Sequence, residues 1–174
     1  MNTNKKIDNK KKHPLNVLTL EELLNKEIPS RHNLLAPWLP SQGLCMIYSI
    51  RGLGKTWMAL EIAYAVASGG NFLNWEAESP QGVLYIDGEM PLSLMQERLS
   101  VIENSRDQMI SGLFNVLSPD AQEFGIPDLS TVEGQAKIDE LISDEIKLVV
   151  LDNLSTLVRS GRESESDSWL LVQE

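Results

Sequence analysis

The chain has 174 residues, of which 42% are hydrophobic and 23% charged, so it has the composition of a globular protein with a substantial core. Its formal net charge is −10, with 15 Lys and Arg against 25 Asp and Glu, and such a surface as a whole is poorly suited to gripping nucleic acid. No apolar run approaches the roughly 18–20 residues that cross a bilayer, and the amino terminus has no apolar signal segment, so we expect neither a membrane protein nor a secreted one.

The charge is unevenly distributed, because residues 1–14 hold five Lys and one Asp, which leaves a net charge of −14 for the remainder. A short basic segment is most often solvated, so we predict a disordered tail over 1–14, with phosphate contacts as the alternative. The single Cys excludes an internal disulfide, and with two His it leaves no zinc cluster, so the composition favours a reducing cytoplasm.

Residues 15–42 are predicted to form a short helix and a connector. Thr19-Leu20-Glu21-Glu22 has the form of a capping box with further Leu residues behind it, which predicts a helix near 19–26. Three prolines then favour an extended connector over 28–42, namely Pro29, Pro37 and Pro40. Trp38 in this connector, like Trp75 further on, could stack on a base, although aromatic residues near a core more often simply pack.

From residue 43 to 174 the sequence alternates between strand and helix patterns. Short apolar runs predict buried strands at 44–48, 83–86, 113–117 and 148–151. We expect Cys45, in the first of these runs, to be buried. Apolar residues at helical spacing predict helices at 57–67, 91–103 and 131–143. This alternation predicts an α/β domain over 43–174, with a mostly parallel central sheet and helices on both faces in three layers.

The segment between the first predicted strand and helix carries the pattern of a phosphate-binding loop. Ser49-Ile50-Arg51-Gly52-Leu53-Gly54-Lys55-Thr56 matches G-x-x-x-x-G-K-[ST], except that Ser49 replaces the first glycine. The glycines let backbone N–H groups turn inward around an anion, beside the positive end of the following helix. The pattern places Lys55 on the β- and γ-phosphates and Thr56 on Mg²⁺. The residues expected to contact a nucleotide are Ser49, Arg51, Gly52, Leu53, Gly54, Lys55, Thr56 and Trp57.

Two later strands are followed by carboxylates. Asp152 ends the apolar run 148–151, where it can hold Mg²⁺ opposite Thr56 or, in the alternative, cap a loop. Asp87 and Glu89 follow the run 83–86, and a carboxylate there can orient and deprotonate a water that attacks the γ-phosphate. Glu89 is the candidate base and Asp87 a structural neighbour. The residues alone leave open the alternative that both acids cap the helix that begins at Pro91.

The phosphate loop, the D-G-E-M after one strand and the L-D-N-L-S-T-L after another together resemble the RecA-like P-loop ATPases over about residues 33–160. Within them, the chain is similar to the plasmid RepA-type and replicative-helicase-like ATPases, often labelled AAA-family ATPases. The resemblance implies that Glu89 is the catalytic base, that Lys55 and Thr56 bind the phosphates and Mg²⁺, and that Asp152 belongs to the metal site. It also implies ATP and Mg²⁺ as cofactors, assembly into a homo-oligomeric ring, and work on DNA.

That family continues with a further strand that senses the γ-phosphate and with loops that face DNA. This sequence stops at 170–174 within an amphipathic helical pattern, so we expect a truncated domain, which can be inactive by itself. Arg159 and Arg162 could belong to a DNA-facing loop, but beside Glu163 and Glu165 a solvated turn is favoured.

The expected function is therefore Mg²⁺-dependent ATP hydrolysis by a RecA-like motor domain, of a DNA replication helicase or a related DNA-linked ATPase. One alternative is a P-loop phosphotransferase, which would need an Arg-rich lid, whereas residues 90–146 hold Arg98 and Arg106 as their only arginines. The other alternative is a non-catalytic nucleotide-binding module.

Overall fold

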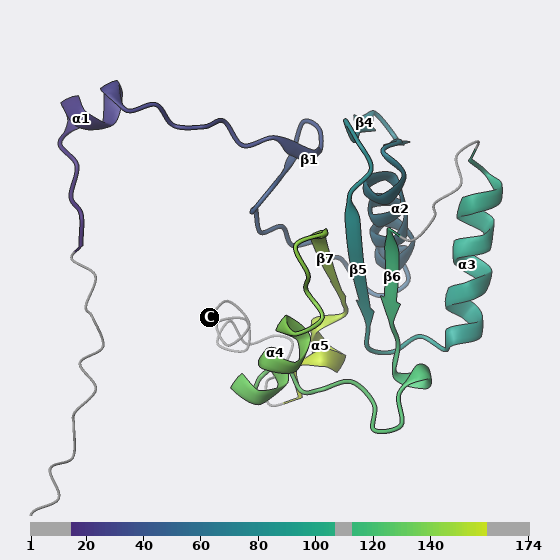
Figure 1. Ribbon diagram of the computed structural model, residues 1–174. Coiled ribbons are helices and arrows are strands. Elements are labelled where there is room, and N and C mark those ends of the chain that lie inside the picture. Colours follow the sequence, from purple (N-terminus) through teal and green to yellow (C-terminus); the bar gives the residue numbers. More distant parts are fainter. Residues whose placement is uncertain (1–14, 107–112, 160–174) are drawn as a thin grey trace, which may run out of the picture. The chain divides into compact units, whose positions relative to one another are not determined.

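The computed structural model describes residues 15–106 and 113–159 of the chain (Figure 1). The chain divides into two units, Met1–Ser30 and Arg31–Glu174. The first contains helix α1 (Leu20–Asn25), where the Thr19 hydroxyl accepts from the Glu22 N–H and the Glu22 carboxylate accepts from the Thr19 N–H. The predicted capping box and helix are confirmed. The basic tail 1–14 lies outside the described residues, as do Arg162 and the segment 170–174.

The second unit alternates strands and helices as the sequence predicts. Its strands are β1 (Asn33–Leu35), β2 (Leu39–Pro40), β3 (Asn71–Phe72), β4 (Trp75–Glu76), β5 (Gly82–Asp87), β6 (Phe114–Leu117) and β7 (Ile146–Asp152). Its helices are α2 (Lys55–Ser68), α3 (Leu92–Asn104), a 3₁₀ turn η1 (Pro119–Ala121), α4 (Val132–Asp139) and α5 (Leu154–Leu157). Helix α4 is shorter than the predicted 131–143, because the chain turns after Glu140 before it enters β7.

The central sheet is parallel and has the strand order β6-β5-β7 (Figure 1). Strand β5 pairs with β6 from Val83↔Phe114 to Ile86↔Leu117, and with β7 up to Asp87↔Asp152. Because parallel strands point the same way, the carboxyl ends of β5 and β7 meet at one edge of the sheet. This register sets Asp87 and Asp152 side by side, 65 positions apart in sequence, and so builds the candidate site.

Helices cover both faces of the sheet, as the fold prediction requires. On β5 the fully buried side chains alternate: Val83 and Tyr85 join a core with α2 and α3, while Leu84 and Ile86 join a second core with α4 and α5. Helix α2 is buried along most of its length, which fits its apolar sequence. The architecture is the α/β class predicted from the sequence and is consistent with a P-loop NTPase fold.

The prediction of a buried strand at 44–48 is wrong for this structure. These residues form no strand, and their side chains are exposed, with Leu44 at 72% and Tyr48 at 86%. Cys45 is exposed as well, so its predicted burial is also wrong. An apolar run becomes a strand only where a neighbouring strand takes up its backbone hydrogen bonds, and among the described residues none pairs with this run.

The region 28–42, predicted as an extended connector, instead contains the antiparallel β1–β2 pair. Leu34, Leu35 and Leu39 are buried in the core beside α2, so the compact unit begins before residue 43. Trp38 and Trp75 pack edge to face, with ring centroids 5.0 Å apart. Their packing role is therefore observed directly.

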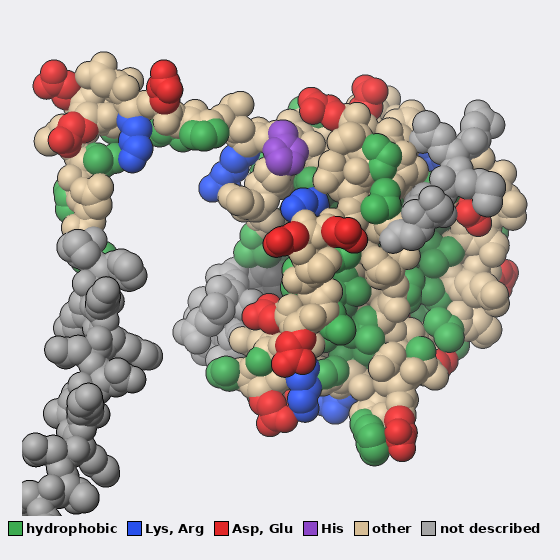
Figure 2. Space-filling view, in the orientation of Figure 1, with side chains coloured by type: hydrophobic (Ala, Val, Ile, Leu, Met, Phe, Trp, Pro, Cys, Tyr) green, Lys and Arg blue, Asp and Glu red, His purple; other side chains and the backbone are tan. Residues whose placement is uncertain are grey.

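The surface of the second unit is mixed in character. Figure 2 shows acidic side chains scattered over this face and a group of hydrophobic side chains exposed in its middle. Val116 of β6 and Val101 of α3 are 36% and 55% exposed. In the described parts of the chain, every helix is too short or too polar to cross a membrane.

Candidate functional site

The predicted phosphate loop joins the exposed segment 44–48 to helix α2. Gly52 and Gly54 have φ angles of 84° and 85°, a left-handed conformation that glycine adopts without strain. Ser49, which stands in the place of the first glycine, is not among the described non-glycine residues with positive φ, which are Gln42 and Leu73. The substitution of Ser for Gly is therefore accommodated without a left-handed backbone.

Helix α2 presents an uncapped amino terminus to this loop. Its N-cap is Gly54, which has no side chain to accept from the N–H groups of the first turn. Those N–H groups and the positive end of the 14-residue helix are suited to an anion such as phosphate. The donor set therefore fits the phosphate chain of a nucleotide.

Lys55 begins α2, and its ammonium turns back onto the loop. Nζ donates to the carbonyl oxygen of Ser49 at 2.7 Å and to that of Ile50 at 3.4 Å. These bonds hold the positively charged Lys55 ammonium against the phosphate loop. The loop residues Ser49, Arg51, Gly52 and Leu53 are exposed, whereas Gly54, Lys55 and Thr56 are half-buried.

Trp57 follows Thr56 on the helix and faces α3. Its ring is 38% exposed, and the Arg98 guanidinium lies 5.3 Å from the ring centroid. This distance is typical of a cation–π contact. It attaches α3 to the first turn of α2 beside the phosphate loop.

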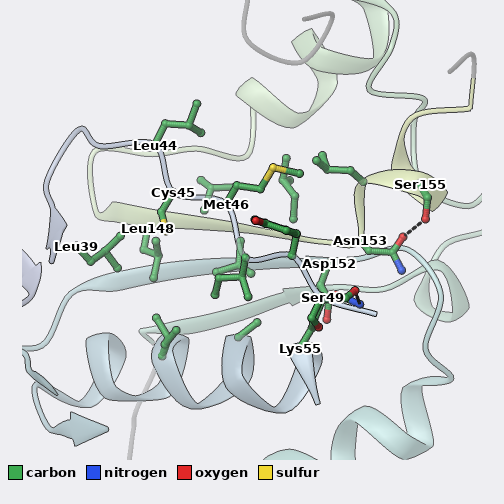
Figure 3. Close-up of a pocket in the computed structure, with 18 of the residues that line it drawn as sticks. Leu39, Leu44, Cys45, Met46, Ser49, Lys55, Leu148, Asp152, Asn153 and Ser155 are labelled. Atoms are coloured by element: carbon green, nitrogen blue, oxygen red, sulfur yellow. Dashed lines mark hydrogen bonds between the residues drawn. The ribbon is translucent and has the colours of Figure 1, made fainter. Parts of the chain in front are cut away.

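Asp152 ends β7 and faces the same cavity as Lys55 (Figure 3). The buried Tyr85 hydroxyl of β5 donates to Asp152 Oδ2 at 2.7 Å. Burial is the main cause that raises the pKa of Tyr85, and the negative charge of Asp152 raises it further. The phenol therefore stays protonated and remains a donor. Tyr85 therefore fixes one oxygen of the predicted metal-binding carboxylate.

Asp87 ends β5 and organises the loop that follows. It is 2% exposed, and its Oδ2 accepts from the backbone N–H groups of Glu89 at 3.2 Å and Met90 at 2.7 Å. Burial raises the pKa of Asp87, and the two N–H donors oppose that shift. With both its bonds made to the loop backbone, Asp87 has the contacts expected of a structural neighbour.

Glu89 lies in that loop with an exposed side chain, and its Oε2 accepts from Asn153 Nδ2 at 2.8 Å. The alternative that the two acids cap α3 finds no support among the described contacts. The Leu92 N–H, in the first turn of α3, donates to Asp120 Oδ2 at 2.9 Å. The N-cap of α3 is Pro91, and the acid that accepts from its first N–H is Asp120, in the η1 turn after β6.

The structure brings together residues from two separate parts of the sequence at one cavity. Ser49, Lys55, Asp152 and Asn153 line it, and residues of β7 form one of its walls (Figure 3). Thr56 and Glu89 do not line this cavity, and Glu89 is joined to it through its bond to Asn153. Arg159 does not line it either, because its guanidinium donates to the Ile126 carbonyl oxygen at 3.0 Å.

Sequence reasoning missed two residues of the site, Tyr85 and Asn153. A polar hydroxyl inside the fully apolar run Val83–Ile86 and an amide directly after Asp152 were the available signals. Each signal shows a polar group that needs a partner, but neither identifies that partner.

The fold and the loop before α2 define the class as an α/β P-loop nucleotide-binding protein. The family model described as AAA domain matches residues 11–174, and the chain belongs to that family. Membership of this family indicates an ATPase-type nucleotide-binding function for the chain. No curated protein matches the chain.

Proposed function

We propose that this chain is the RecA-like motor domain of a DNA replication helicase or a related DNA-linked ATPase, and that it hydrolyses ATP with Mg²⁺. The observation that carries the proposal is the Asp87↔Asp152 register, which sets the D-G-E loop beside the predicted metal ligand. The uncapped start of α2 lies at the same edge, where Lys55 and Asp152 line one cavity.

Each candidate residue has a role that its chemistry suits. Lys55 and the N–H groups around Gly52 and Gly54 would hold the phosphates. Thr56 and Asp152 would hold Mg²⁺, whose preferred ligands are oxygens. When bound, Mg²⁺ neutralises charge on the β- and γ-phosphate oxygens.

Glu89 would act on the attacking water. Its exposed carboxylate is bonded to Asn153, which lines the cavity with Lys55. Such a carboxylate can accept a hydrogen bond from water, orient it, and take its proton as the new P–O bond forms. The Asp87 carboxylate would hold the loop backbone, and Tyr85 would hold Asp152. These contacts leave Glu89 as the site's candidate base.

The DNA-linked part of the proposal rests on the resemblance of the D-G-E-M and L-D-N-L-S-T-L segments to RecA-like ATPases. By the same resemblance, the protein would assemble as a homo-oligomeric ring. The single Cys and the polar amino terminus make the cytoplasm its expected location. The net negative charge makes a confined basic channel, rather than the whole surface, the expected DNA contact.

The test is phosphate release from ATP by the protein, measured with and without Mg²⁺ and with and without single-stranded DNA. The proposal predicts Mg²⁺-dependent release to water that DNA stimulates. Phosphate transfer to a small acceptor in place of water would indicate a P-loop phosphotransferase. Nucleotide binding without any release would indicate a non-catalytic module.

A further inference from the structure

The loops at the ends of β5 and β7 are tied to each other at the candidate site. The Gly88 N–H donates to the Asp152 carbonyl oxygen at 2.8 Å. A Cβ on Gly88 would collide with the Thr156 hydroxyl and approach Leu157, so the first loop packs directly on α5. A residue with a Cβ at position 88 would have to displace the Thr156 side chain, so the two loops are in close contact.

Glu89 is held from two sides within this contact. Its backbone N–H donates to Asp87 Oδ2, and its carboxylate Oε2 accepts from Asn153 Nδ2. An exposed Glu side chain ordinarily samples many rotamers, so a 2.8 Å bond to a fixed donor removes much of that freedom. Oε2 is engaged, and among the described residues no hydrogen bond engages Oε1, so this oxygen is available to accept from a water.

The Asn153 donor is itself fixed. Asn153 is the N-cap of α5, and its Oδ1 accepts from the Thr156 N–H at 3.2 Å and from the Ser155 hydroxyl at 2.6 Å. Because a backbone N–H can bond only to the amide oxygen, the amide nitrogen must point the other way, toward Glu89. The same side chain thus caps a helix and aims a donor at the candidate base.

We propose that Asn153 is a positioning residue that orients the Glu89 carboxylate toward the attacking water. The inference rests on the proposed ATP hydrolysis and adds to it a residue that acts through Glu89. Asn153 touches neither phosphate nor water in this assignment. Its effect is on the orientation of the Glu89 carboxylate.

The test is Asn153→Ser, which keeps a good N-cap for α5 but removes the donor that reaches Glu89. Turnover of ATP should fall roughly 10- to 100-fold, the scale on which small misplacements of a catalytic group act, while KM changes little. A second N-cap variant, Thr131→Ala, removes the bond from the Gly134 N–H at the start of α4, remote from Glu89 in its contacts. It should lower stability without lowering kcat.

The decisive comparison repeats Asn153→Ser in a Glu89→Gln background. If Asn153 acts through the Glu89 carboxylate, the second substitution should cause no further loss of turnover, because the group it positions is already gone. The same fold loss in both backgrounds would overturn the proposal, since it would show a purely structural effect.

The inference and the proposed function fail in different ways. Suppose that the Asn153→Ser variant turns over ATP at the parent rate, while the Glu89→Gln variant loses turnover. That result would overturn the positioning role alone. A Glu89→Gln variant that hydrolyses ATP like the parent would overturn the assignment of the base and the positioning role with it.

Discussion

Replacing Tyr85 by Phe isolates the hydrogen bond that holds Asp152. The ring stays the same size and keeps its stacking on Phe114, where the ring centroids are 6.2 Å apart. What is lost is the 2.7 Å bond from the buried hydroxyl to Asp152 Oδ2. The substitution removes the donor and leaves Asp152 Oδ2 to water, so its effect reports the bond less what water restores.

The magnitude follows from the exposure of the two partners. A hydrogen bond to a charged group contributes about 1.5–3 kcal/mol to stability. Asp152 is half-buried, so water can take over part of the lost bond, and we expect Tyr85→Phe to cost about 1–2 kcal/mol. For a chain of this length that corresponds to a fall in Tm of about 2–8 °C.

The assay is denaturant and thermal unfolding of the parent, Tyr85→Phe, Asp152→Ala and the double variant. The double-mutant cycle should give a coupling free energy of about 1–2 kcal/mol between the two side chains. Tyr48→Phe is the matched control, because Tyr48 is 86% exposed, and its effect should stay within about 0.5 kcal/mol. A coupling energy below about 0.5 kcal/mol would refute the claim that Tyr85 fixes Asp152.

Three further predictions concern the phosphate loop, the metal and pH. Lys55→Ala should weaken ATP binding by about 1.5–3 kcal/mol in a nucleotide titration, and equal affinities would remove Lys55 from the site. Asp152→Asn should shift the Mg²⁺ dependence of ATP binding and leave metal-free affinity nearly intact, whereas an unchanged Mg²⁺ curve would contradict the metal assignment. Burial raises the pKa of Asp128, but hydrogen bonds from Ser130 and Arg159 outweigh it and lower the pKa overall. The stability they confer is present above about pH 4 and lost as pH falls through the lowered value, so Asp128→Asn should flatten the acid limb of the stability profile, and an unchanged limb would count against this account.

The parts of the fold that depend on local sequence were predictable. The phosphate loop contains two glycines with positive φ and leads into an apolar helix, and both features can be read from neighbouring residues. The sequence also placed Asp87 and Asp152 at the ends of two strands of a parallel sheet. That these two strands are neighbours, so that the two carboxylates lie side by side, is known only from the structure.

The parts that depend on distant partners were not predictable. Leu44–Tyr48 has the composition of a buried strand, but a strand also needs a neighbour, and no described strand pairs with it. The bond from Asn153 to Glu89 joins residues 64 positions apart, and neither the D-N nor the D-G-E segment predicts this contact. Asp120 likewise accepts from the Leu92 N–H at the start of α3 although it follows Leu92 by 28 positions, a contact that no local sequence pattern predicts.

The central claim is that Glu89 is the base of an ATPase, and Glu89→Gln in the full-length protein tests it most directly. The amide keeps the shape of the side chain but cannot take a proton, so ATP should still bind while turnover falls by roughly 10²–10⁴-fold. Asp87→Asn is the comparison, and its effect should be milder, because Asp87 bonds to the loop backbone. A Glu89→Gln protein that binds and hydrolyses ATP at the parent rate would contradict the account.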